Sequence, residues 1–200
     1  NDHGDGKVGH GWDSIDYLQS QNPTRGGQLY KFRNYMIHNL FHNNNNNKEV
    51  ITIPNSITDL PMNEPLVVLF SSYSSTTRSQ SFKSQVESLR NTIQDKDKLQ
   101  LYGIDNDDIE IQVQSYTFSK LSLEEQITLA SKAAIFVTIS GGGAITASFL
   151  PRGGSVLLYY RETGGVKNND NTGLPARLDW DFFNHAGYLH VHWLPVGSLN

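Results

Sequence analysis

The residues that this chain lacks narrow its chemistry. It contains no cysteine, which excludes disulfide bonds, thiolate nucleophiles and cysteine-ligated zinc but does not decide the cellular compartment. It has no signal peptide and no apolar run near the roughly 20 residues that span a bilayer, so any membrane anchor is expected upstream of this chain. Its net charge is −4. A protein without a basic footprint is not expected to bind nucleic acid or an anionic membrane surface.

Length and apolar content predict one main domain with a smaller annex. The 200 residues, of which 37% are hydrophobic, can bury one good core. We assign residues 1–64 to an N-terminal annex, with a helix near 27–41 and a flexible asparagine-rich linker at 43–47. Residues 65–200 form the main domain. Because the chain begins with Asn rather than Met, we expect it to be a fragment.

The main domain alternates between strand and helix signals. Buried strands are predicted at Leu66–Phe70, Ala134–Ile139 and Ser155–Tyr160, a half-exposed strand through 109–113, and helices over 82–93, 122–134 and 144–150. Such alternation predicts an α/β fold, a Rossmann-like parallel sheet with flanking helices. Ligands in these folds bind at the carboxyl ends of the strands. Two loops fall there, at Ser71–Ser79 and at Ser140–Gly143.

The helix before the second buried strand has the clearest start signal. Ser122 followed three positions later by Glu125 is a capping box. Apolar residues then recur on one helical face and predict a core-facing stripe. That stripe consists of Leu123, Ile127, Ala130 and Ala134.

A triple-glycine turn follows the strand at Ala134–Ile139, and it is the strongest candidate for a binding site. Residues Ser140 to Ala144 read Ser-Gly-Gly-Gly-Ala. Glycine permits positive φ and close approach of a ligand to the backbone, and a helix N-terminus after such a turn favours an anion. The motif is not a Walker A loop, because no Lys-Ser or Lys-Thr follows, and the spacing of a dinucleotide-binding Rossmann motif is absent. The alternative is a turn with a purely structural role.

Charged residues near the strand ends are further candidates. The guanidinium of Arg78 can clamp a diphosphate opposite the glycine turn, the alternative being a surface ion pair. Arg161 and Glu162 are candidates for nucleoside contacts, the alternative being a solvated loop. His190 and His192 share a strand face, but no acidic third ligand stands at a sensible spacing, so we predict no metal site.

The run LSLEEQITLASKAAIFVTISGGGAITASFLPRGG resembles the catalytic domain of glycosyltransferase family 61. Members of that family carry a Glu-Gln-hydrophobic helix, a hydrophobic strand, a His-Gly-Ala-Gly-like turn and a Phe-hydrophobic-Pro-X-Gly segment. The corresponding elements here are Glu125-Gln126-Ile127, Ile135 to Ile139, Ser140 to Ala144 and Phe149 to Gly153. Upstream, VVLFSSYSSTTRSQSF looks like the family's arginine-containing loop, and GGQLYKFRNYMI looks like its preceding helix with a Phe-Arg pair.

The resemblance implies an enzyme, a glycosyltransferase that moves a sugar from a nucleotide-sugar donor to a glycan or glycoprotein hydroxyl with inversion. This chain would be mainly the donor-binding C-terminal half of a two-domain GT-B architecture. Arg78 and the glycine turn would then stabilise the diphosphate leaving group. The general base normally comes from the other half, so the catalytic residues stay unassigned. The resemblance also implies the secretory pathway, in the Golgi or ER lumen, and no firm cofactor, with a divalent ion left open.

Two departures from the family pattern keep other functions open. Ser140 stands where the family usually has histidine, and Tyr73 stands near the place of an additional arginine. The alternative function is a non-catalytic nucleotide- or sugar-binding module that retains the fold. A third reading is an unrelated α/β scaffold, which would have no affinity for nucleotides.

Overall fold

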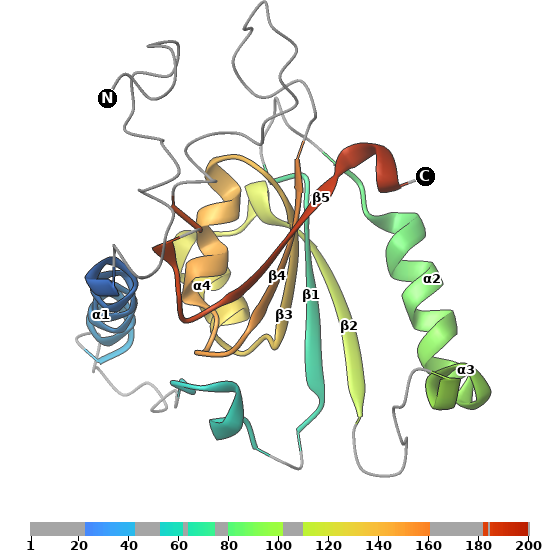
Figure 1. The fold of residues 1–200 in the computed structure, drawn as a ribbon, viewed down its shortest axis with the longest axis horizontal. Coiled ribbons are helices and arrows are strands. Elements are labelled where there is room, and N and C mark those ends of the chain that lie inside the picture. Colours follow the sequence, from blue (N-terminus) through green and yellow to red (C-terminus); the bar gives the residue numbers. More distant parts are fainter. Residues whose placement is uncertain are drawn as a thin grey trace, which may run out of the picture.

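A computed structural model describes residues 23–42, 53–61, 64–74, 80–101, 110–160, 182–183 and 185–199 (Figure 1). The α-helices are α1 (Pro23–His42), α2 (Lys83–Gln94), α3 (Lys96–Leu101) and α4 (Leu123–Ser131). The 3₁₀ helices are η1 (Ile57–Asp59), η2 (Phe118–Lys120), η3 (Gly142–Phe149) and η4 (Val196–Leu199). The strands are β1 (Leu66–Ser72), β2 (Ile111–Thr117), β3 (Ile135–Ile139), β4 (Ser155–Tyr160) and β5 (His190–Pro195).

The five strands form one parallel sheet in the order β2-β1-β3-β4-β5. This confirms the predicted α/β class with a Rossmann-like parallel sheet and flanking helices. The chain leaves β1 toward β2 on one side and reaches β3 on the other side of β1. The strand order therefore reverses between β1 and β3, which is the topological switch point where doubly wound sheets bind ligands.

Helices cover both faces of the sheet. Successive side chains of a parallel strand point to opposite faces, and because both sets are apolar here, both faces are buried. Leu69 and Phe136 belong to the cluster that includes residues of α1, α4 and η3, whereas Phe70 and Val137 pack with Phe82 before α2. Figure 1 shows α1 and α4 on one side of the sheet and α2 on the other. Each of these buried side chains contributes roughly 1.5–3 kcal/mol relative to an exposed one. The two clusters hold the strand ends in fixed positions.

The start of α4 agrees with the capping box, but its apolar stripe begins later than predicted. Ser122 Oγ accepts from the Glu125 backbone N–H at 3.2 Å, and the Glu125 carboxylate accepts from the Ser122 N–H at 2.7 Å. Ile127 and Ala130 are fully buried, as the stripe requires. Leu123, the first residue of the helix, is 55% exposed.

Other boundaries differ from the sequence prediction for local reasons. Strand β1 continues through Ser71 and Ser72, because both residues pair with β2 instead of beginning the loop. The predicted helix over 144–150 is the 3₁₀ helix η3, which starts two residues earlier, at Gly142. Helix α3 was not predicted, and the proline-rich segment before β1 contains η1. The described part of the chain contains no helix long and apolar enough to cross a membrane.

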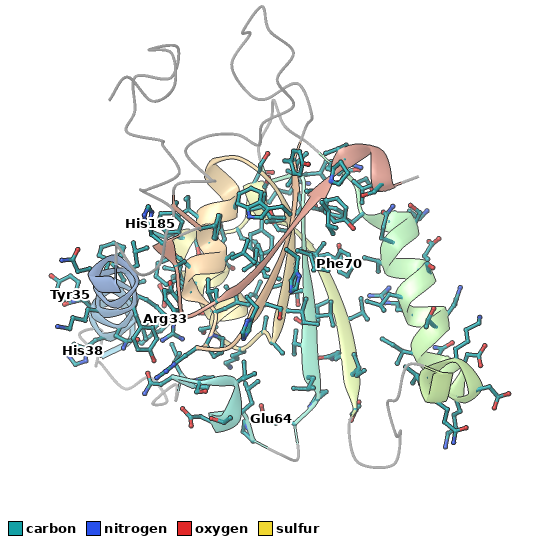
Figure 2. The ribbon with its side chains drawn as sticks, in the orientation of Figure 1. Arg33, Tyr35, His38, Glu64, Phe70 and His185 are labelled. Atoms are coloured by element: carbon teal, nitrogen blue, oxygen red, sulfur yellow. The ribbon has the colours of Figure 1, made fainter. Side chains whose placement is uncertain are left out.

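Helix α1 forms as predicted and packs against the main domain through a buried arginine. Arg33 is 1% exposed, and its guanidinium donates to the carbonyl oxygens of residues in and next to η3. Figure 2 shows Arg33 on the side of α1 that faces the sheet and Tyr35 on the outer side. The asparagine tract at 43–47 lies outside the described residues, so the division of the chain near residue 64 stays a prediction.

Candidate functional site

The glycine turn and the end of β1 meet at the switch point. Phe70 pairs with Val137 of β3, so the last residues of both strands leave the sheet side by side. A Cβ atom built on Gly143 would lie 2.6 Å from the Ser74 Cβ. Only a residue without a side chain allows this approach, so Gly143 is the point where the loop after β1 rests on the start of η3.

The turn places two backbone N–H groups at the N-terminus of η3. Gly141 has φ +135°, which favours glycine, and its carbonyl accepts the first hydrogen bond of η3 from the Ala144 N–H at 2.8 Å. The N–H groups of Gly142 and Gly143 precede that bond and have no partner within the helix. Among the described residues, a Cβ built on Gly142 would meet nothing within 4 Å. No described residue therefore blocks the approach of a ligand to Gly142.

The two ends of the predicted binding segment, Ser140 and Ala144, are less accessible than the glycines. Ser140 is 6% exposed, and its backbone N–H donates to the Tyr159 carbonyl of β4 at 2.7 Å. Ala144 is fully buried, and its N–H is used inside η3. These two residues fix the turn at both ends, which leaves Gly142 and Gly143 to present their N–H groups.

Hydrogen bonds hold the described residues at the two ends of the loop after β1. Tyr73 has φ +49°, a left-handed conformation that is uncommon for a residue other than glycine. Its N–H donates to the Gln80 carbonyl at 3.1 Å, and its carbonyl accepts from the Ser119 N–H at 3.3 Å. Lys120 directly follows Ser119 and brings a cation to the same edge of the sheet. The backbone strain at Tyr73 is held by hydrogen bonds from two neighbouring segments.

Two serine hydroxyls at the end of β1 differ in their partners. Ser72 Oγ lies 3.1 Å from Ser115 Oγ of β2. Ser71 is fully buried, and its Oγ has no hydrogen-bond partner among the described residues. A buried hydroxyl without a partner lowers the stability of the fold by about 1–3 kcal/mol, so stability does not explain a serine at position 71.

Electrostatics at this edge come from backbone dipoles, hydroxyls and the Lys120 ammonium group. Within the described loop residues 71–74 and 139–144 there is no carboxylate and no histidine. The first turn of α4 does carry acids, and hydrogen bonds from Ser122 hold the pKa of the Glu125 carboxyl below its ordinary value. That carboxylate already serves as a helix cap. The chemistry that the turn offers is therefore recognition of an anion by N–H groups.

Several predicted residues lie outside the described part of the chain. These are Arg78, Arg161 and Glu162, so their proposed contacts stay predictions. The side chains of His190 and His192 are exposed on β5. Among the described residues, no group of three His, Cys, Asp or Glu side chains is placed to hold a metal ion.

The sequence predicted Ser71 and Ser74 only as members of the loop Ser71–Ser79, and it assigned no supporting role to Arg33. In the structure Ser74 lies against Gly143, and Arg33 holds the C-terminal end of η3. The Ser-Ser pair after the apolar run Leu66–Phe70 was a signal for Ser71, because polar residues that directly follow a buried strand reach the carboxyl edge. No local pattern distinguishes the buried Arg33 from a surface arginine.

Comparison with known proteins adds no family. No protein-family model matches this chain, and no curated protein matches it. The resemblance to glycosyltransferase family 61 therefore rests on the motifs in the sequence.

Proposed function

We propose that this chain binds the diphosphate of a nucleotide-sugar and is the donor-binding half of an inverting glycosyltransferase. The observation that carries the proposal is the open turn at Gly142 and Gly143, beside the loop after β1 at the switch point of a parallel sheet. Anions at such turns are stabilised by free N–H groups and by the positive end of the helix dipole. Nucleotide phosphates are the common ligands of switch points in doubly wound sheets.

In the proposed sugar transfer, negative charge develops on the diphosphate leaving group. The acceptor hydroxyl attacks the anomeric carbon, the bond from that carbon to the diphosphate oxygen breaks, and the hydroxyl proton passes to a general base. Negative charge then grows on the departing nucleoside diphosphate. The N–H groups of Gly142 and Gly143 support that charge, and Arg78, two positions before Gln80 in the chain, is the proposed side-chain partner. No residue of this chain is assigned as the base.

A second candidate is a module that binds a nucleotide or a sugar without catalysis. It is favoured by Ser140, which stands where the family usually has histidine and is 6% exposed, so this position offers the donor no imidazole. Golgi or ER localisation and a glycan or glycoprotein acceptor belong to the first candidate only.

An assay of nucleotide release separates the two candidates. The chain is incubated with UDP-, GDP- and CMP-sugars, with and without a panel of glycan and glycoprotein acceptors, and released nucleotide is measured. Release that depends on an acceptor and falls in Gly142→Val supports the glycosyltransferase. Saturable nucleotide binding without release supports the binding module, and the absence of both would refute the proposed site.

A further inference from the structure

The C-terminal end of η3, opposite the glycine turn, is held by an unusual arrangement of donors. Three successive carbonyl groups, those of Ser148, Phe149 and Leu150, accept hydrogen bonds from side chains outside η3. Arg33 Nε lies 3.1 Å from the Phe149 oxygen and 2.8 Å from the Leu150 oxygen. Tyr188 donates its hydroxyl to the Ser148 oxygen at 2.7 Å. We call these two side chains the Arg33–Tyr188 clamp.

The clamp is buried and built as a unit. Arg33 is 1% exposed and Tyr188 is 9% exposed. The Tyr30 ring connects them, because its centroid lies 5.7 Å from Arg33 Cζ and 5.1 Å from the Tyr188 ring centroid. Arg33 also donates from Nη2 to the Pro54 carbonyl at 3.0 Å. Burial of a guanidinium is costly, and this one is stabilised by carbonyl dipoles and an aromatic face.

The clamp and the glycine turn lie at opposite ends of the same helix. Helix η3 is a single 3₁₀ segment of eight residues, with the glycines at its N-terminus and the clamp at its C-terminus. At its middle, Thr146 Oγ1 donates to Gln126 Oε1 of α4 at 3.1 Å. The hydrogen bonds from the Ala144 N–H to the Gly141 oxygen at 2.8 Å and from the Leu150 N–H to the Ala147 oxygen at 3.1 Å tie both ends into one helix, so a shift of its C-terminal end displaces the turn. The cation at the carbonyl end of η3 also complements an anion at its N–H end, since both are favourable partners of the helix dipole.

We infer that the Arg33–Tyr188 clamp is a positioning device for the candidate site: through η3 it fixes the position of the N–H groups of Gly142 and Gly143 that would bind a diphosphate. The inference rests on the proposed function for its ligand. It makes α1 part of the machinery of the site, through the C-terminal end of η3. Loss of the clamp frees the end of η3 and weakens binding at the other end.

The test uses Tyr188→Phe and Arg33→Lys, with Arg90→Met as the matched control. Tyr188→Phe removes one hydrogen bond and keeps the ring, and Arg33→Lys keeps the charge but loses the Nε–H that the Phe149 and Leu150 carbonyls share. Arg90 belongs to α2, which packs on the other face of the sheet, and also donates to a backbone carbonyl, that of Val113 at 2.9 Å. Arg33→Met removes the cation altogether, and the two milder variants carry the comparison if it fails to fold.

Two measurements are made on each folded variant. The first is the affinity for pyrophosphate and for UDP, which we expect to fall about 2- to 30-fold in the clamp variants and to stay within error in Arg90→Met. The second is the amide ¹H–¹⁵N shift of Gly142 and Gly143 without ligand. We expect both amides to move in the clamp variants and to stay in place in the control.

The two measurements separate this inference from the proposed function. If the unaltered chain binds neither pyrophosphate nor UDP, the proposed function fails, and the amide shifts alone decide whether the clamp positions the turn. If the chain binds these ligands and the clamp variants bind them as tightly as Arg90→Met does, the inference is overturned. Glycine amides that move no further in the clamp variants than in the control overturn it as well.

Discussion

Gly143 and Gly142 are neighbours in the same turn, yet alanine should affect them in opposite directions. A Cβ on Gly143 would lie 2.6 Å from Ser74 Cβ and 3.1 Å from Ser74 Oγ. Carbon atoms in contact prefer about 3.5–4.0 Å, so the loop after β1 must retreat by about 1 Å. Overpacking of this kind costs about 1–3 kcal/mol. Within the described ranges, a Cβ on Gly142 meets nothing within 4 Å, and Gly→Ala at a compatible position stabilises by about 0.4–1 kcal/mol through the unfolded state.

Urea denaturation at equilibrium, followed by circular dichroism, measures the difference between the two variants. Gly142→Ala should unfold at a higher urea concentration than Gly143→Ala, by an amount equivalent to about 1.5–4 kcal/mol. The double variant Gly143→Ala with Ser74→Gly should recover most of the loss, because the clashing atoms are gone. Equal stability of the two alanine variants, or no recovery in the double variant, would refute the contact between the turn and the loop.

Three further predictions concern the residues around the turn. Ser71→Ala should keep or raise the free energy of unfolding, by up to about 1 kcal/mol, whereas Ser72→Ala should lower it by about 1 kcal/mol because its hydroxyl has a partner; urea titration of both variants checks this pair. The Glu125 carboxylate should contribute fully to the free energy of unfolding above about pH 4.5, its ordinary pKa, and this contribution should be lost as the pH falls through the lower pKa of the folded state. In Glu125→Gln, which keeps the cap, the free energy of unfolding should depend less on pH in acid. Arg33→Met should lower the free energy of unfolding by about 3 kcal/mol, because buried carbonyls lose their donor, and a loss under about 0.5 kcal/mol by urea denaturation would contradict this.

The fold was predictable because its signals are local and periodic. Apolar runs of strand length, separated by amphipathic segments, predict a parallel sheet, and the chain confirms it over Leu66–Tyr160. The capping box at Ser122 located the start of α4 to within a residue. The glycine run also predicted the turn after β3, because glycine is the residue that φ +135° at Gly141 demands.

The supports of the candidate site were not predictable, because they depend on contacts between distant segments. Arg33 and Leu150 are 117 positions apart, and no pattern near either residue reveals their hydrogen bond. Gly143 meets Ser74 only because the sheet order brings β1 next to β3. Helical propensity did not reveal that η3 is a 3₁₀ helix.

The motif residues of the family resemblance have structural roles in this chain. Glu125 caps α4, and Gln126 both accepts from Thr146 of η3 and donates to the carbonyls of Phe118 and Leu121. Gly153 has φ +87° and faces Ile57 of η1. A shared set of such residues is expected of proteins that hold a glycine turn in the same way, and binding at the turn has to be measured directly.

Calorimetric titration with UDP, GDP and CMP tests the central claim most directly. The chain, Gly142→Val and Arg78→Ala are titrated side by side, and Gly142→Val is expected to fold because no described residue lies within 4 Å of its Cβ. The account predicts saturable binding of one nucleotide to the unaltered chain and loss of that binding in Gly142→Val. Binding that persists unchanged in Gly142→Val, or no binding of any of the three nucleotides to the unaltered chain, would contradict the claim that the glycine turn is a phosphate site.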